Sequence, residues 1–148
     1  MGVLGLDDNG ECRILAEKTA SDVMSSPVLT VSPEDTISKA ARLMYEGNVG
    51  SVVVVDDMGK AVGILTRRDI IYLVAMGLTR RDPLVRIYMK EPVLYCQPDD
   101  TLKEVLRRMK AAGVRHIVVS SEPGKAPLGI VSMYDILTTL AGACLDDS

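Results

Sequence analysis

An internal repeat constrains the fold of this chain more than any other feature. The stretch MSSPVL at residues 24–29 returns as MKEPVL at residues 89–94, an offset of 65. The stretch GILTRRDI at residues 63–70 returns as GIVSMYDI at residues 129–136, an offset of 66, so one residue has been inserted in between. A repeat of this length is one structural unit that must bury its apolar face against another. The sequence therefore predicts two copies of one small fold, packed together.

The same order of secondary-structure elements is predicted for each copy. Apolar residues at helical spacing follow Thr36 and Thr101, two natural N-caps, and a glycine, Gly47 or Gly113, then closes the helix. The other predicted strands are an extended piece at 28–31, buried strands at 52–55 and 117–119, and second strands at 62–65 and 128–131. Each copy ends in a last helix. Its predicted inward residues are Ile70, Ile71 and Val74 in the first copy and Ile136, Leu137 and Leu140 in the second. This order predicts small three-stranded sheets covered by helices.

The predicted fold class is α/β (α+β), with two tandem repeats, each a three-stranded sheet with two helices, related by pseudo-two-fold symmetry. The predicted boundaries are an N-terminal extension at 1–19, repeat 1 at 20–77, a linker at 78–84, repeat 2 at 85–141 and a C-terminal tail at 142–148. The extension is expected either to cover the repeats with a short helix or strand, or to be a tail. Because Phe and Trp are absent, the core must be aliphatic.

Charge and hydropathy exclude several classes of function. The net charge is -3 and the pI is near 5.2, so no broad positive field attracts nucleic acid. No apolar run approaches the roughly 20 residues that a membrane span needs, and the first ten residues do not resemble a signal peptide. We therefore expect a cytoplasmic protein that binds neither membranes nor nucleic acid.

The residues that usually carry catalysis or bind metals are sparse. Cys12, Cys96 and Cys144 lie far apart in the sequence, and His116 is the single histidine. These residues predict neither a metal site nor a Cys/His catalytic pair. The sequence also offers no general base beside a nucleophile and no carboxylate cluster for Mg²⁺. We expect a protein that is not an enzyme and has no catalytic cofactor.

Both copies resemble the cystathionine-β-synthase (CBS) domain, which occurs in tandem as a Bateman module. The resemblance rests on a Met-x-x-x-Val opening, an Asp-Thr helix start and a closing motif of Gly, two apolar residues, Thr or Ser, two variable residues and Asp, and it covers about residues 20 to 141. It implies an adenine nucleotide bound in the cleft between the repeats. It also implies a homodimer, a disc of four repeats, that regulates a separate partner protein.

The closing motif is the strongest candidate site. Thr66 and Ser132 stand at the predicted start of each last helix, with Asp69 and Asp135 three residues later. A helix-capping arrangement explains this pattern without any ligand. The resemblance implies that the two aspartates also hold the ribose hydroxyls, with Thr66 and Ser132 near the sugar or phosphate.

The resemblance extends to the adenine and phosphate groups. It places adenine against backbone groups of Val28 and Val93. The other candidate ligand-binding residues are Ala41, Ile64 and Ile130 as apolar walls, Thr36 and Thr101 at the helix starts, and Arg67, Arg68, Arg115 and His116 for the phosphate. Each arginine could equally be a solvated surface charge, and His116 a half-buried strand residue.

The two copies differ at their basic positions. Gly50 and Ser51 occupy the places of Arg115 and His116, whereas Met133 and Tyr134 occupy those of Arg67 and Arg68. This difference predicts one good nucleotide site and one weaker or empty site. AMP is favoured, and ADP and ATP remain possible. The alternatives are an S-adenosylmethionine-type ligand and a structural dimerisation module with empty sites.

Overall fold

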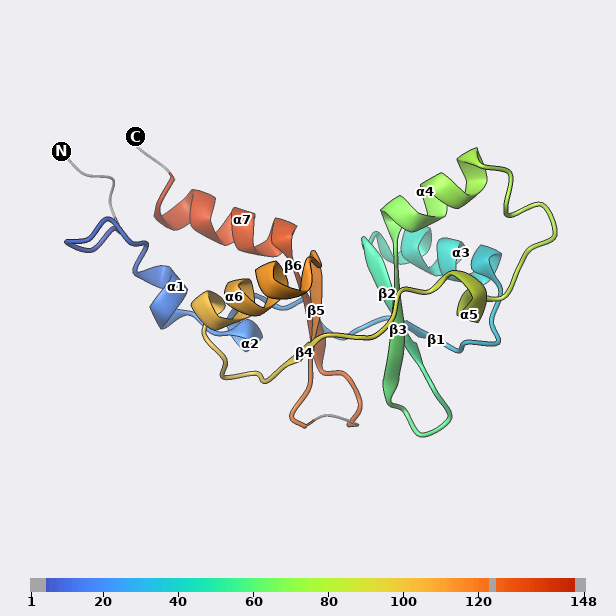
Figure 1. Cartoon of the computed structure of the whole chain (residues 1–148), viewed down its shortest axis with the longest axis horizontal. Coiled ribbons are helices and arrows are strands. Elements are labelled where there is room, and N and C mark those ends of the chain that lie inside the picture. The colour runs from blue at the N-terminus through green and yellow to red at the C-terminus, as the bar shows by residue number, and fades with distance from the viewer. Residues whose placement is uncertain (1–4, 123–124, 146–148) are drawn as a thin grey trace. The chain divides into compact units, whose positions relative to one another are not determined.

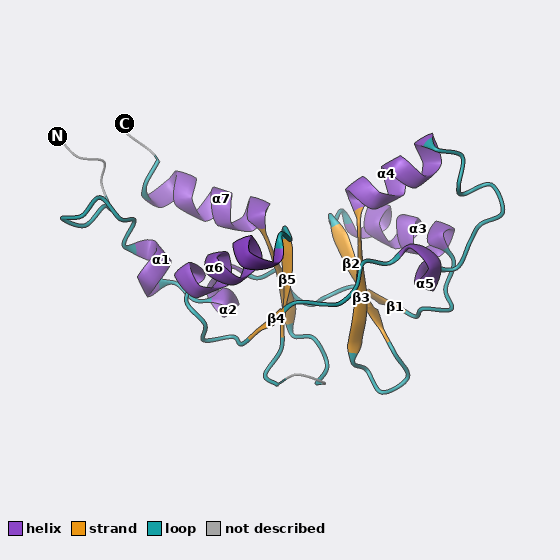
Figure 2. Cartoon of the chain, in the orientation of Figure 1, coloured by secondary structure: helices purple, strands orange, loops and turns teal. Residues whose placement is uncertain are grey.

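The computed structural model describes residues 5–122 and 125–145, which form two compact units. Unit 1 contains the described parts of Met1–Ser26, Leu94–Pro123 and Leu128–Ser148, and unit 2 contains Pro27–Val93 with the described part of Gly124–Pro127. Both units combine a small sheet with helices (Figures 1 and 2), which confirms the predicted mixed fold class.

Unit 2 has a three-stranded sheet in the order β1-β2-β3. The short β1 (Thr30–Val31) runs parallel to β2 (Ser51–Val55), which pairs antiparallel with β3 (Ala61–Thr66). Its helices are α3 (Ile37–Gly47), α4 (Arg67–Ala75) and α5 (Val85–Tyr88). Val52 and Val54 of β2 and Leu65 of β3 are buried against residues of the helices, and together they form an apolar core without Phe or Trp.

Unit 1 repeats this arrangement, with a sheet in the order β4-β5-β6. Here β4 (Tyr95–Cys96) runs parallel to β5 (His116–Val119), which pairs antiparallel with β6 (Gly129–Ser132). Its helices are α1 (Ile14–Glu17), α2 (Ala20–Val23), α6 (Leu102–Ala112) and α7 (Met133–Ala143). Both predicted strand pairs and both predicted helix pairs are therefore present.

The opening segment of each sequence copy packs on the sheet of the other copy. The backbone of Ser25 pairs with Ile130 of β6, and the backbone of Lys90 pairs with Ile64 of β3. The methionine of each opening segment lies over a strand glycine: a Cβ on Gly63 would come within 2.6 Å of the Met89 sulfur. The repeated Met and Gly are thus two halves of one packing contact.

The ends of the first helix in each copy follow the prediction with one correction. The Thr36 hydroxyl accepts a hydrogen bond from the Lys39 N–H at 3.2 Å, and Thr101 caps the matching helix in the same way. Gly113 ends α6 in the left-handed conformation, with φ of 67°. In α3, however, Gly47 is still helical, and Asn48 adopts the left-handed conformation. Asparagine tolerates this region better than most residues, which explains the one-residue shift.

The inward face of the last helices is narrower than predicted. The side chains of Ile71, Val74 and Leu137 are 60%, 59% and 54% exposed, so the prediction that they face inward was wrong. Ile136 is buried as predicted, and Ile70 and Leu140 pack against the cores; Leu73 of α4 is a buried residue that the prediction missed. A short helix on a sheet buries a single stripe of side chains, which leaves a second apolar stripe on its outer side.

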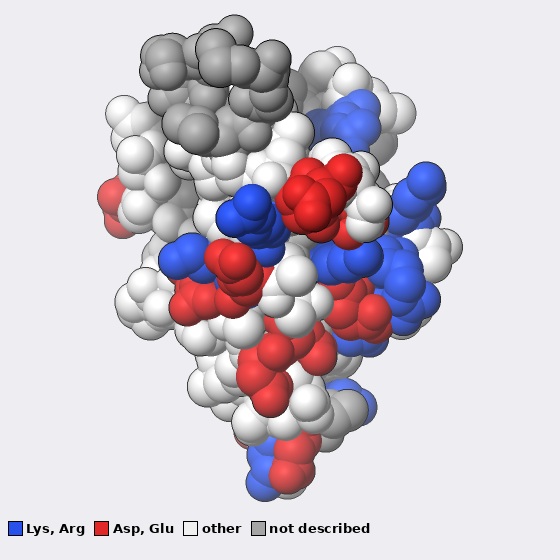
Figure 3. All heavy atoms as spheres, turned by 90° about the vertical axis from the view of Figure 1, so that its left-hand side faces the viewer, with Lys and Arg blue, Asp and Glu red and all other residues white. Residues whose placement is uncertain are grey.

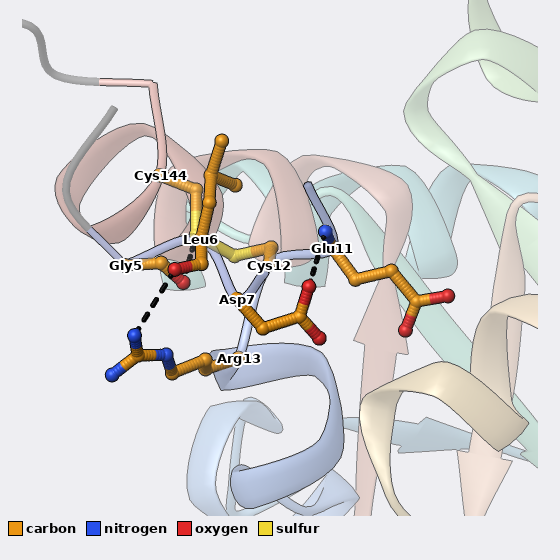
Figure 4. Close-up of a disulfide and its surroundings, with 7 residues drawn as sticks. All are labelled: Gly5, Leu6, Asp7, Glu11, Cys12, Arg13 and Cys144. Carbon is orange, nitrogen blue, oxygen red and sulfur yellow. Dashed lines mark hydrogen bonds between the residues drawn. A yellow bond between two sulfur atoms is a disulfide. The ribbon is translucent and has the colours of Figure 1, made fainter. Parts of the chain in front are cut away.

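A disulfide joins Cys12 to Cys144, with Cα atoms 5.9 Å apart, and ties the N-terminal extension to the end of α7 (Figure 4). Residues 6–13 of the extension form a turn: the Asp7 carboxylate accepts a hydrogen bond from the Glu11 N–H at 2.8 Å, and the Arg13 guanidinium donates to the Leu6 carbonyl at 3.2 Å. Residues 14–17 of the extension form the short helix α1, which contacts α6 of the same unit. The sequence did not predict the disulfide, because 132 positions separate the two cysteines.

The surface and the helix lengths bear on possible partners. Figure 3 shows basic and acidic side chains interspersed over one face, where the described residues form no uniformly basic surface. Within residues 5–122 and 125–145, none of the helices has both the length and the apolar character needed to cross a membrane.

Candidate functional site

The closing motif forms the same capping box in both units. In unit 2 the Thr66 N–H donates to Asp69 Oδ2 at 2.9 Å, and the Asp69 N–H donates to the Thr66 hydroxyl at 3.2 Å. In unit 1 the corresponding distances between Ser132 and Asp135 are 2.9 and 3.1 Å. The predicted capping arrangement is therefore confirmed. It holds each aspartate in one orientation at the positive end of a helix dipole.

The two carboxylates differ in what faces their second oxygen. Asp69 Oδ1 forms an ion pair with Lys90 Nζ at 3.1 Å, and the Asp69 side chain is only 13% exposed. Within the described residues, no lysine or arginine forms an ion pair with Asp135, and its Oδ1 accepts no hydrogen bond. Among the residues that the structure describes, Asp135 Oδ1 thus has no partner, whereas Asp69 Oδ1 already has one.

A strand begins beside each capping box. In unit 1 the candidate phosphate ligands Arg115 and His116 lie at the start of this strand, whereas in unit 2 Arg67 and Arg68 lie at the start of the helix. The Arg67 N–H donates to the Gly50 carbonyl at 2.8 Å, and the Met133 N–H donates to the Arg115 carbonyl at 2.9 Å. A Cβ on Gly50 would lie 4.0 Å from the Arg67 guanidinium. Each unit thus carries one arginine where a strand start meets a helix start. In unit 2 this is Arg67, at the helix start, and in unit 1 it is Arg115, just before the strand.

The other two basic candidates have different surroundings. His116 is the cross-strand partner of Ser132 and is half-buried, so the structure brings it beside the unit 1 capping box. Ser51 has the equivalent place opposite Thr66. The Arg68 guanidinium instead lies 5.6 Å from the centre of the Tyr72 ring, one turn further along α4.

The remaining candidate ligand-binding residues, which are the apolar residues and the helix-capping threonines, are distributed over both units. Ile64 and Ile130 are each 7% exposed, although neither belongs to the hydrophobic core cluster of its unit. Val28, Ala41 and Val93 are half-buried. Of the candidate residues, unit 2 contains Val28, Thr36, Ala41, Ile64, Thr66, Arg67, Arg68, Asp69 and Val93, and unit 1 contains Thr101, Arg115, His116, Ile130, Ser132 and Asp135.

Cys96 is a buried free thiol in β4. Burial raises its pKa to about 12, so it is protonated at neutral pH and is a poor nucleophile. Among the described residues, no group of three or more His, Cys, Asp or Glu side chains could hold a metal ion.

The sequence reasoning missed Lys90, the ion-pair partner of Asp69. Its signal lies in the repeat itself: Lys90 occupies the position that matches Ser25, so a charged residue stands in one copy where a neutral residue stands in the other. Only the pairing of Lys90 with Ile64 shows that this position faces the closing motif.

The repeats match the family model of the CBS domain over residues 20–76 and 84–142. The chain belongs to the CBS domain family. An uncharacterised protein of Methanopyrus kandleri is 33% identical over 120 residues, which are 80% of this chain and 61% of that protein. The chain therefore spans less than two thirds of that relative, and it spans 33% of another from Methanocaldococcus jannaschii.

Solved structures of CBS domain proteins share this fold. The crystal structure of an uncharacterised conserved protein from Pyrococcus horikoshii has a TM-score of 0.71 and 34% identity, and the match covers 82% of this chain and 91% of that one. The CBS domain pair of protein MJ0100, solved with 5′-methylthioadenosine and S-adenosyl-L-methionine, has a TM-score of 0.73 and 25% identity, over 84% of this chain and 97% of that one. The latter protein thus binds adenosyl compounds on the same fold.

Proposed function

We propose that this CBS domain pair is a regulatory module that binds an adenosyl ligand through the carboxylates of its two closing motifs. The observation that carries the proposal is the Asp135 capping box, which orients the carboxylate and leaves Oδ1 unused by the described residues. A carboxylate can accept hydrogen bonds from both hydroxyls of a ribose. The adenosyl compounds bound by the MJ0100 pair support the same class of ligand.

Within this class we favour AMP, with ADP and ATP as further candidates. The support is the position of Arg115 and His116 beside Ser132, because a phosphate needs a positive counter-charge near the aspartate. S-adenosylmethionine is the second candidate. It is favoured by the ligands of the MJ0100 pair and needs no cation for a phosphate.

The experiment is isothermal titration of ligand-free protein with AMP, ATP and S-adenosylmethionine. We expect micromolar binding, about -8 kcal/mol, and a rise in melting temperature at saturating ligand. Tighter binding of AMP than of S-adenosylmethionine supports a phosphate site, and the reverse order supports the second candidate. Absence of binding to all three contradicts the proposal and leaves the structural dimerisation module.

We further propose that the module forms a homodimer, a disc of four repeats, and acts on a separate protein in the cytoplasm without catalysing a reaction. Exposed apolar side chains on the last helix of each unit, Ile71 and Val74 on α4 and Leu137 on α7, support dimerisation, because a partner can cover such side chains. Light scattering should give twice the chain mass, and Ile71→Lys should shift it to the monomer. A monomeric wild-type protein would contradict the dimer.

A further inference from the structure

The backbone pairing of the opening segments allows a direct comparison between the two proposed ribose-binding aspartates, Asp69 and Asp135. Lys90 exchanges backbone hydrogen bonds of 2.9 and 3.1 Å with Ile64, two residues before Thr66. Ser25 exchanges hydrogen bonds of 2.9 and 3.2 Å with Ile130, two residues before Ser132. Lys90 and Ser25 therefore occupy equivalent positions relative to their capping boxes, but only Lys90 carries a positive charge.

We propose that Lys90 is a built-in competitor for the ribose hydroxyls at Asp69, so that ligand binds first and more tightly at Asp135. This inference rests on the proposed function and adds an order of occupancy to it. Lys90 Nζ lies 3.1 Å from Asp69 Oδ1, the oxygen that the capping box does not use. A ribose hydroxyl that donates to this oxygen must displace the ammonium or share the acceptor with it.

The effect is modest because the ion pair is only partly shielded. The Lys90 side chain is 66% exposed, and exposed ion pairs contribute little because water and salt screen them. We expect Lys90 to weaken binding at Asp69 by about 3-fold to 10-fold. Such a factor separates a first site from a second one while leaving both accessible at high ligand concentration.

The repeat provides a reciprocal exchange as the test. Lys90→Ser gives unit 2 the residue of unit 1, and Ser25→Lys gives unit 1 the residue of unit 2. Both side chains are exposed, so neither substitution disturbs a core. Lys39→Ser is the matched control, because it removes the same charge from an ion pair of the same length, 3.1 Å to Asp35, away from the two closing motifs.

Each variant is titrated with AMP and with S-adenosylmethionine as the full chain, freed of bound ligand. Asp135→Ala isolates binding at Asp69, and in that background Lys90→Ser should tighten binding 3-fold to 10-fold. Ser25→Lys alone should weaken the first binding event by a similar factor, and Lys39→Ser should change neither.

Three results would overturn this inference and leave the proposed function standing. They are two equal sites in the wild-type protein, a Lys90→Ser effect no larger than that of Lys39→Ser, and loss of all binding in Asp135→Ala that Lys90→Ser does not restore. Absence of binding in the wild-type protein and in Lys90→Ser would overturn both proposals. The titrations thus distinguish failure of the competitor from failure of the ligand class.

Discussion

The two units have the same sheet order and the same capping box, but they differ in covalent cross-linking and in the charge beside the capping box. Unit 1 contains all three cysteines and is closed by the Cys12–Cys144 disulfide, whereas unit 2 contains none. Unit 2 neutralises its capping-box carboxylate with Lys90, whereas unit 1 places Ser25 in the same position. Duplication thus kept the packing positions and let the exposed positions diverge, because only the former are constrained by the core.

The largest expected effect tests the disulfide of unit 1. Reduction, or Cys12→Ser, should lower the free energy of unfolding by about 2 to 4 kcal/mol, because the bond restricts the unfolded chain. Calorimetry with and without dithiothreitol measures the loss. As a control, dithiothreitol should have no further effect on Cys12→Ser. Equal stability of the wild-type protein under both conditions would contradict the prediction.

The packing of methionine on glycine should be equally important in both units. Gly63→Ala and Gly129→Ala should each destabilise by about 1 to 3 kcal/mol, because the new methyl group meets the side chain of Met89 or Met24. Urea unfolding measures both losses. Gly142→Ala in α7 is the control. Apart from its own helix, no described residue lies within 4 Å of its Cβ position, and alanine there should slightly stabilise the helix. A loss of stability in only one of the two variants would show that the methionine–glycine contacts of the two units are not equivalent.

The anchors should be unequal in ligand binding. Asp135→Ala should weaken binding of the favoured ligand about 10-fold to 100-fold, because it removes a charged acceptor, and Asp69→Ala should weaken it less. Isothermal titration measures both. The control is Asp22→Ala in the Thr19 capping box of α2, which lies outside the candidate sites and should bind normally. Unchanged affinity in both Asp69→Ala and Asp135→Ala would refute the anchor proposal.

Acidification should give the smallest effect, shared by the two units. Backbone N–H groups hold the pKa of Asp22 and Asp35 below the usual range, and hydrogen bonds from Ser38 and Arg107 do the same for Asp82 and Glu104. Since these pKa values are lower in the folded state, the stabilisation is present above about pH 4 and is lost as the pH falls through the folded values.

Because each unit contains two of these four groups, their loss should destabilise both units together. Thermal melts between pH 6 and pH 2 measure this decline. A melting temperature that rises on acidification would contradict the sign.

The repeat pattern predicted most of the local structure. The caps at Thr36, Thr101, Thr66 and Ser132 were predictable because a hydroxyl before an apolar helical face satisfies a free backbone N–H. The outward stripe of Ile71 and Val74 was not predictable, because an apolar residue has the same spacing whether its own sheet or another surface covers it.

The sequence by itself determined the duplicated fold, its aliphatic core and the paired Thr/Ser and Asp of the closing motif. These features depend on local spacing and on the type of residue, which a sequence displays directly. Only the tertiary structure decided that Cys12 meets Cys144, that Met24 and Met89 pack on glycines of the other copy's strand, and that Lys90 faces Asp69. These contacts join positions far apart in the chain, and their partners become neighbours only when the opening segments cross to the opposite sheets.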